Sequence, residues 1–361
     1  METDILIIGG GIAGVSAAAR LAPHAKVILL ETESALAHHA SGRSAALYEP
    51  RYGTPAVVEL SLASGEFFHG TAGILSPRGL LMVAKTGDEA VFETDAKGMH
   101  LDPILVDEAL AKVPVLNPSV VTRAAFAAHA WDIDTDLLIQ NFAREARTHG
   151  ATLLTNAKVT GISKSEAGWS VTSAGGTFTT KVIVNAAGAW VDVIATLAGV
   201  TPLGFTPYRR SMARIPAPED CDVSTWPMIF GAGESWYAKP DAGALIVSPA
   251  EEHLMDPHDA WADDMVLAEG LARYEAFVTK PVTRLIANWA GLRTFSPDRT
   301  MVIGRDPTEP NFFWLAGQGG QGFQTCPGAS QLAADLILGR NTGLAPTLLS
   351  ALSPERFRQH I

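Results

Sequence analysis

Three glycines near the start of the chain have the spacing of a phosphate-binding turn. Gly9, Gly11 and Gly14 fit the pattern G-x-G-x-x-G, between the apolar run 4–8 and a small-residue helical stretch, and a second apolar run ends at Glu31. In such a unit the glycines allow a tight turn, close approach of a pyrophosphate and close packing of helix on strand. The phosphates lie at the helix N-terminus, and the acid binds a ribose. The pattern predicts a dinucleotide site without choosing between FAD and NAD.

The same strand–glycine–helix order returns near the C-terminus. The stretch "FFWLAGQGGQGFQT" at 312–325 places Gly319, Gly320 and Gly322 between an apolar run and a helical stretch, whereas 204–250 alternates like an antiparallel sheet. We therefore expect an α/β fold (α+β overall), in which an FAD- or NAD-type Rossmann-like domain carries an inserted substrate domain. The predicted nucleotide-binding segments are 1–75, 136–203 and 289–361, and the predicted substrate-domain segments are 76–135 and 204–288.

Helices and loops follow from local composition. Residues 34–54 are small, polar and glycine-bearing and are predicted to form a loop, while 88–112 is charged and compatible with one helix. The stretch 133–150 has Asp and Thr near its start, an apolar stripe and a closing glycine, which predicts a helix.

Composition narrows the function classes. The chain has 361 residues, a net charge of −11 and no basic run, which argues against nucleic acid or an anionic membrane as a partner. Cys221 and Cys326 form no CxxC pair, which argues against zinc and iron–sulfur sites and favours reduced thiols. Glu2 and Asp4 do not fit a signal peptide, no apolar stretch is long enough for a membrane span, and no His/Asp/Glu spacing indicates a metal site. We expect a cytoplasmic protein without a metal.

Several motifs together resemble one family. "GGGIAG", "HHASGRSAALY", "VNAAGAW", "GLRTF" and "AGQGGQGFQT" are similar to the FAD-dependent amine oxidoreductases of the D-amino acid oxidase superfamily, which includes glycine and sarcosine oxidases. Within it, "RRS", "GESWYAKPDAG" and "WAGLR" are most similar to bacterial D-arginine dehydrogenases. The resemblance spans nearly the whole chain and implies FAD as the cofactor and a substrate domain built on an antiparallel sheet.

The resemblance also implies which residues meet the FAD. Arg43 would donate to the phosphates, Val159 would meet the adenine through its backbone, and the second glycine loop would stabilise negative charge on the reduced ring. His38 or His39 could bond to the flavin or be attached to it. The residues expected at the FAD are Gly9, Gly11, Ile12, Ala13, Gly14, Glu31, Thr32, Ser41, Arg43, Ser44, Ala45, Ala46, Val159, Ala187, Gly188, Trp190, Gly291, Arg293, Gly319, Gly320, Gly322, Phe323 and Gln324.

Four residues are expected at the substrate. Arg293 would bind a carboxylate through its two-pronged guanidinium, and Tyr237 would add a hydroxyl. Arg210 matches a second family arginine, with Arg209 as the alternative one position away, and Tyr52 matches a tyrosine that lines the site.

Two positions depart from the arginine-specific relatives. Leu47 stands where they have a histidine, and Leu81, or Leu80 beside it, stands where they have a glutamate. A leucine-lined pocket would leave a guanidinium without partners, so we expect an apolar or small substrate side chain. Glu49 could partly replace the missing acid.

The resemblance implies a D-amino acid dehydrogenase or oxidase. It would oxidise the C–N bond of a small-molecule amino acid to an imine, which becomes a 2-oxo acid, and pass electrons to oxygen or a quinone-type acceptor. The alternatives are an enzyme for a secondary amine such as sarcosine, a 2-hydroxy acid dehydrogenase, and a flavin-binding module without turnover.

Overall fold

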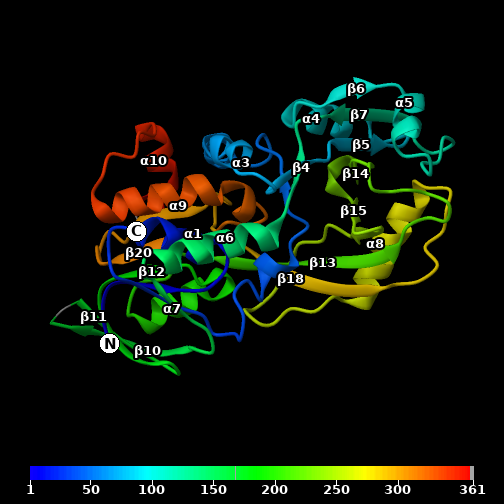
Figure 1. The fold of residues 1–361 in the computed structure, drawn as a ribbon. Coiled ribbons are helices and arrows are strands. Elements are labelled where there is room, and N and C mark those ends of the chain that lie inside the picture. The colour runs from blue at the N-terminus through cyan, green and yellow to red at the C-terminus, as the bar shows by residue number, and fades with distance from the viewer. Residues whose placement is uncertain (167, 358–361) are drawn as a thin grey trace.

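The first sheet is built around the N-terminal strand of the chain. The computed structural model describes residues 1–166 and 168–357, and Figure 1 shows this sheet with α1, α6 and α9 on one side. Its eight strands run in the order β10-β11-β12-β1-β2-β9, with β20 beside β12 and β19 beside β20. Their bounds are β1 (Glu2–Ile8), β2 (Val27–Leu30), β9 (Thr152–Leu154), β10 (Val159–Ser165), β11 (Gly168–Ser173), β12 (Gly176–Asn185), β19 (Val302–Arg305) and β20 (Phe312–Ala316).

Alternating side chains of β1 bury both faces of this sheet. Ile5 and Ile7 pack into one core with α1 (Ile12–Leu21), α6 (Thr135–Thr148) and α9 (Gly322–Leu338). Leu6 and Ile8 belong to the core on the opposite face, with α7 (Val191–Leu197). Since β1 pairs in parallel with β2 and β12, its carboxyl end delivers the chain directly into the turn before α1. That edge is where α/β sheets bind their ligands.

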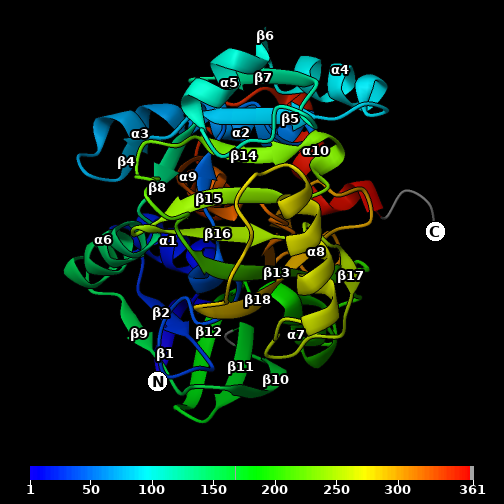
Figure 2. The ribbon, with the colours of Figure 1, turned by 90° about the vertical axis from the view of Figure 1, so that its right-hand side faces the viewer.

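The second sheet has nine strands and is mostly antiparallel. Its order is β17-β13-β16-β15-β14-β5-β7-β6, with β18 beside β13; the pair β14–β5 is parallel, so the sheet is mixed at that point. The helices α5 (Val106–Lys112) and α8 (Asp264–Ala276) contribute to the core of one face, and α4 (Glu89–Gly98) to that of the other (Figure 2). The strands are β5 (Leu80–Ala84), β6 (Asp102–Ile104), β7 (Arg123–Ala127), β13 (Thr206–Pro216), β14 (Met228–Gly231), β15 (Tyr237–Asp241), β16 (Ala244–Ser248), β17 (His253–Leu254) and β18 (Ala287–Phe295).

A third, small sheet connects the two parts. It consists of β3 (Leu47–Tyr48), β8 (Trp131–Ile133) and β4 (Leu75–Pro77). The predicted loop 34–54 therefore contains the strand β3 and a short 3-10 turn, η1 (Ala40–Arg43). The remaining helical elements are α2 (Pro55–Ala63), α3 (Gly65–Gly70), η2 (Gly188–Trp190), η3 (Ala232–Glu234), α10 (Pro346–Leu352) and η4 (Pro354–Phe357).

Two sequence expectations differ from the structure in their bounds. The stretch 88–112 is not one helix: α4 ends at Gly98, and β6 containing Pro103 precedes α5. The expected boundary at residue 289 falls inside β18, which pairs with β13 from Thr206 to Arg214 and so belongs to the second sheet. Strand β18 belongs to the second sheet, but its residues 291–294 line a cavity together with the turn at the start of α1.

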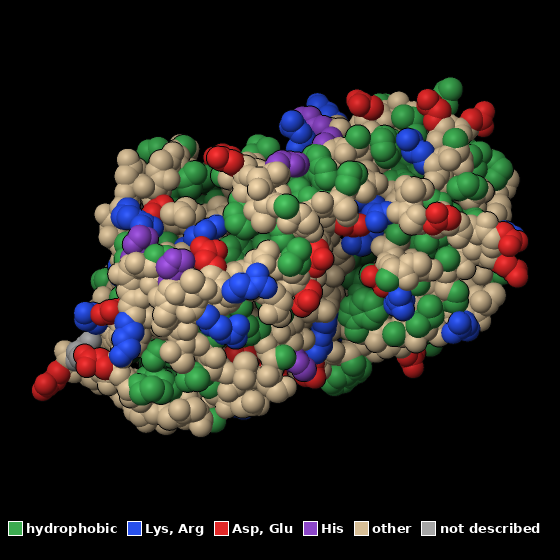
Figure 3. Space-filling view, in the orientation of Figure 1, with side chains coloured by type: hydrophobic (Ala, Val, Ile, Leu, Met, Phe, Trp, Pro, Cys, Tyr) green, Lys and Arg blue, Asp and Glu red, His purple; other side chains and the backbone are tan. Residues whose placement is uncertain are grey.

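No helix among the described residues combines the length and the apolar character needed to cross a bilayer. On the face shown in Figure 3, acidic and basic side chains are interspersed.

Candidate active site

A first cavity begins at the N-terminus of α1. Its volume is about 810 Å³, and it extends past η1 to the second glycine loop and to β13 and β18. Most of the residues expected at the FAD line it, namely Gly11, Ile12, Ala13, Ser41, Arg43, Ser44, Gly188, Gly291, Arg293, Gly319, Gly320, Gly322 and Phe323. Segments that are more than 300 residues apart in the sequence thus line one shared cavity.

The glycine turn is packed so closely that two of its glycines have no room for a side chain. A Cβ atom on Gly14 would lie 2.0 Å from the carbonyl oxygen of Gly9. A Cβ atom on Gly9 would lie 2.3 Å from the carbonyl oxygen of Ala186, and its φ of +111° is one that L residues rarely adopt. Gly11 differs, because it lines the cavity and its added Cβ would meet only the Ser41 hydroxyl at 3.1 Å. The turn therefore needs glycine for packing at two positions and for ligand approach at the third.

Glu31 is fixed at the end of β2 beside this turn. Its carboxylate accepts hydrogen bonds from the backbone N–H groups of Gly10 (2.6 Å) and Glu33 (2.9 Å), and only 8 % of the residue is exposed. Thr32 follows on the surface. A carboxylate has more acceptor sites than these two bonds use, so Glu31 retains acceptor capacity for a ribose.

Arg43 lines the cavity but is held by protein acceptors. Its Nη1 donates to the carbonyl oxygens of Ala260 (2.8 Å) and Ala290 (2.9 Å), and its Nη2 lies 2.5 Å from the carboxylate of Asp259. We expected these donors at the phosphates. In the structure they instead tie η1 to β18 and to the 259–260 segment, which shapes the cavity wall.

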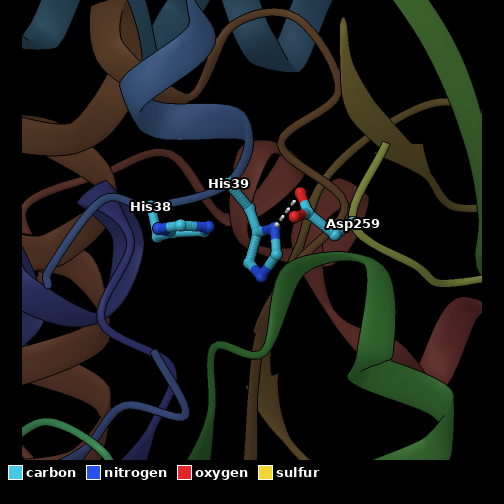
Figure 4. Close-up of side chains that lie close together, drawn as sticks. All are labelled: His38, His39 and Asp259. Atoms are coloured by element: carbon cyan, nitrogen blue, oxygen red, sulfur yellow. Dashed lines mark ion pairs between the residues drawn. The ribbon is translucent and has the colours of Figure 1, made fainter. Parts of the chain in front are cut away.

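A group of possible metal ligands lies next to Arg43, although the sequence spacing indicated none. His38, His39 and Asp259 place one ligand atom each within 4.8 Å of one another (Figure 4). Asp259 is more than 200 residues from the histidines, so no spacing pattern could reveal the group. His39 Nε2 already lies 3.0 Å from Glu33, and Arg43 already supplies positive charge to Asp259. These ion pairs account for the arrangement without a metal.

A second cavity adjoins the first and is lined largely by residues of the second sheet. Its volume is about 800 Å³, and it shares Ser44, Arg210, Arg293 and Gly320 with the first. All four residues expected at the substrate line it, as do Leu47, Ala45, Ala46 and Gln324. The two cavities thus meet at a pair of arginines.

Leu81 does not line this cavity. It is completely buried in the core on the other face of the sheet, with Trp236 and Ala238, while Leu80 lines the cavity in its place. Successive residues of a strand point to opposite faces, so an error of one position moves a side chain to the wrong side of the sheet.

Arg293 is the central feature of the junction. It lies on β18 opposite Tyr208 of β13 and lines both cavities. Its guanidinium has no hydrogen-bond or ion-pair partner among the residues that the structure describes, and Gly320 packs against it so closely that a Cβ there would lie 3.1 Å from Nη1. A cation with unused donors, facing a cavity, is suited to bind an anion in a two-pronged geometry.

Arg210 lies on the same face of the sheet as Arg293, on the neighbouring strand. It is 5 % exposed, and its side chain donates to the Glu251 carbonyl oxygen (2.9 Å) and lies 3.4 Å from the Glu252 carboxylate. Burial, together with the nearby Arg293, lowers the pKa of Arg210 from its usual value. Arg209, the alternative, points to the opposite face, where it lies 3.6 Å from Asp263. The strand register thus selects Arg210 as the cavity-facing arginine.

Two tyrosines complete the substrate cavity. Tyr237 is buried, and its hydroxyl donates only to the thioether of Met212 (3.3 Å), a weak acceptor that a carboxylate would outcompete. The Tyr52 hydroxyl lies 2.9 and 3.0 Å from the two carboxylate oxygens of Glu234. Burial, and next the Glu234 charge, raise the pKa of Tyr52, so it remains a hydrogen-bond donor.

Substitution of Tyr52 with phenylalanine tests this bond. Without the hydroxyl, the Glu234 carboxylate is free to pair with Arg210 and Arg293 and to compete with a substrate carboxylate. We expect KM to rise roughly 3- to 10-fold with FAD content unchanged. Steady-state kinetics measure the effect, and Tyr274→Phe, in the core on the other face of the sheet, is the control. If KM of Tyr52→Phe were unchanged, Glu234 would not compete with the substrate carboxylate for the two arginines.

The remaining expected FAD residues lie outside the first cavity. Val159 begins the edge strand β10, and Trp190 packs on His39 with ring centroids 4.7 Å apart. Ala187 belongs to the core beneath the first sheet, whereas Gln324 hydrogen-bonds the backbone of Glu49 and Tyr52 at 3.1 Å each. Gln324 therefore positions the 49–52 segment.

Sequence reasoning missed several lining residues. The first cavity also contains Ala40, Met212, Leu292, Thr294 and Gln318, and the second contains Met99, Met228, Phe230, Glu234, Trp236 and Gln321. Met212 could have been found, because it lies two residues from Arg210 and so shares its face. Leu292 and Thr294 lie in "GLRTF", and Gln318 and Gln321 lie in "AGQGGQGFQT", so these two motifs were the available signal for them.

Comparison with known proteins agrees with this arrangement. The family model described as "FAD dependent oxidoreductase" (DAO) matches residues 4–336. "FAD-dependent oxidoreductase domain-containing protein 1" of Bos taurus is 25 % identical over 97 % of this chain and 84 % of its own length. Glycine oxidase of Pseudomonas putida is 24 % identical over 96 % and 97 %. The crystal structure of glycine oxidase from Geobacillus kaustophilus superposes with a TM-score of 0.82 at 22 % identity, covering 100 % and 99 % of the two chains, a likeness of fold.

Proposed function

Because the chain belongs to the DAO family of FAD-dependent oxidoreductases, we propose that it oxidises the C–N bond of a D-amino acid with an apolar or small side chain. The product would be an imine, which water converts to a 2-oxo acid and ammonia. The observation that carries the proposal is the Arg293 guanidinium, which has no protein partner among the described residues and lies where the two cavities meet.

The residues of the first cavity fit FAD. The Gly11 position has no side chain toward the cavity, Glu31 beside the turn keeps acceptor capacity, and Gly319, Gly320 and Gly322 also line the cavity. These features suit, respectively, a pyrophosphate, the ribose of the adenosine and a flavin ring. When bound, FAD supplies the two-electron oxidation, and the protein binds and orients the substrate.

The second cavity supplies the groups that would hold the substrate. Arg293 would grip the carboxylate with two parallel N–H donors, and Arg210 would add a second positive charge from the neighbouring strand. Tyr237 would exchange its weak thioether contact for a hydrogen bond to the carboxylate. Anchoring the carboxylate at the junction directs the α-carbon toward the first cavity and the side chain into the second.

An anaerobic flavin-bleaching screen tests this proposal. The holoenzyme is mixed with both enantiomers of the amino acids, with sarcosine and other N-methyl amino acids, and with 2-hydroxy acids. We expect D-amino acids to reduce the flavin faster than their L enantiomers, the N-methyl amino acids and the 2-hydroxy acids. Reduction by only the secondary amines or only the hydroxy acids would contradict the proposal and favour the corresponding alternative. Admission of air or of a quinone then identifies the electron acceptor.

A further inference from the structure

Glu49 is a buried acid in the wall of the substrate cavity. It follows β3, is 3 % exposed, and lines the second cavity but not the first. The same wall contains the apolar side chains of Leu47, Leu80, Met228 and Phe230. Burying a carboxyl group among apolar side chains costs free energy unless hydrogen-bond donors or a cation satisfy it. The hydrogen bonds of Glu49 therefore show whether it has a purely structural role.

The Glu49 carboxylate is only half satisfied. Oε1 accepts a hydrogen bond from the backbone N–H of Arg51 at 2.9 Å. Oε2 is buried and has no hydrogen-bond partner within the described chain, although His129 Nε2 lies 3.3 Å away without bonding geometry. A buried acceptor without a donor is expensive, and a donor supplied by a ligand would remove that penalty.

Within the described residues, no lysine or arginine forms an ion pair with this acid. Burial raises the pKa of Glu49 to about 7, against the lowering effects of the Arg51 N–H and charge. Burial and the Arg51 charge lower the pKa of His129, so this histidine is neutral near pH 7. The other charged neighbours of His129 are His100 and Asp102, whose effects on its pKa are opposite.

Glu49 lies away from the junction at which the two arginines line both cavities. Arg210 and Arg293 line both cavities, whereas Glu49 lines only the second. A substrate whose carboxylate is held by the arginines, with its α-carbon toward the first cavity, has its side chain left to occupy the second. Glu49 is therefore placed to meet the side chain and not the reacting C–N bond.

We propose that Glu49 is a specificity-determining residue that accepts a hydrogen bond from a donor group, foremost a cationic one, at the end of the substrate's side chain. This inference rests on the proposed function and revises its substrate class from wholly apolar side chains to side chains with an apolar stem and a donor tip. Such a stem can lie along Leu47 and Leu80 while the charged head reaches the carboxylate, as lysine side chains do on apolar surfaces.

The test compares D-lysine with D-norleucine, which lacks only the terminal ammonium. Holoenzyme and the variants Glu49→Gln and Glu49→Leu are assayed for kcat/KM with each substrate. We expect Glu49→Gln to lower kcat/KM for D-lysine about 30-fold and to change that for D-norleucine less than about 3-fold. Glu66→Gln, an exposed acid on α3, is the matched control and should change neither.

A pH profile of the wild-type enzyme gives a second readout that needs no variant. The ratio of kcat/KM for D-lysine to that for D-norleucine cancels the shared α-amino group. Because the pKa of Glu49 is about 7, its negative form dominates only above that value, and the ratio should rise as the pH passes upward through it. In Glu49→Gln the ratio should be flat.

The outcomes separate this inference from the proposed function. Oxidation of D-norleucine with no preference for D-lysine at any pH, or equal losses for both substrates in Glu49→Gln, overturns the role of Glu49 and leaves the proposed function standing. Failure of both D-amino acids and of the whole amino-acid screen to reduce the flavin overturns both.

Discussion

Substitution of Arg293 with alanine should raise KM for amino-acid substrates about 100-fold and leave the FAD content unchanged. A two-pronged pair between a guanidinium and a carboxylate, largely removed from water, contributes several kcal/mol, and each 1.4 kcal/mol changes affinity tenfold, so a loss of about two powers of ten is the expected size. The described residues offer no replacement of equal geometry, because the Tyr237 hydroxyl can donate only one hydrogen bond and Arg210 is already bonded to the 251–252 segment. Steady-state kinetics and the flavin absorbance of the purified variant measure the two effects.

Two further arginine variants sharpen the result. Arg293→Lys keeps the positive charge but loses the two parallel N–H donors of the guanidinium, so its KM should lie between those of the unchanged protein and Arg293→Ala. Arg214→Ala removes an arginine from the same strand as Arg210, but Arg214 pairs with Asp241 at the far end of β13 and lines neither cavity of the described chain, so KM should stay unchanged. Loss of FAD from Arg293→Ala would mean that this arginine serves the flavin instead of the substrate.

The parts of the fold that were predictable have strong local signals. The run 4–8, the glycine turn and Glu31 appear as β1, the turn before α1 and the end of β2, because buried parallel strands are continuous apolar runs and the turn requires glycine. The mixed α/β fold and the FAD-dependent family are confirmed. The stretch 88–112, whose charged composition is compatible with helix, contains two helices separated by β6, because Pro103 does not fit a helix interior.

The cavity residues that could be predicted are those whose side-chain chemistry suits a carboxylate ligand. Arg293, Arg210, Tyr237 and Tyr52 meet in one cavity, as the motifs indicated. The errors arise where the answer depends on register or on distant contacts. Leu80 and Leu81 are chemically identical and differ only in the face of β5 they occupy.

The partners of Arg43 show the same dependence on distant contacts. Its acceptors Asp259, Ala260 and Ala290 lie more than 200 residues away, and no local pattern could reveal them. The bond between Tyr52 and Glu234 joins residues 182 positions apart, so no local pattern could reveal it either.

The largest effect on the cofactor should come from Gly14→Ala. The new Cβ would lie 2.0 Å from the carbonyl oxygen of Gly9, a backbone atom that cannot rotate away, so the first turn of α1 must move relative to β1. Ile12 and Ala13 on that turn line the first cavity, so the shift displaces the groups that we expect to meet the phosphates. We expect FAD affinity to fall at least about tenfold and the free energy of unfolding to fall by about 1–3 kcal/mol, the usual penalty of overpacking.

The control separates a loss of cofactor from a general loss of stability. Gly70→Ala, at the end of α3, places its Cβ where no atom lies within 4 Å, so it should keep both FAD and stability. Flavin content after purification, FAD titration of the apoprotein and thermal unfolding of both variants measure the effects. If Gly14→Ala bound FAD as tightly as the unchanged protein, the turn would not be the pyrophosphate site, because a ligand held by backbone N–H groups cannot tolerate a displacement of the turn that presents them.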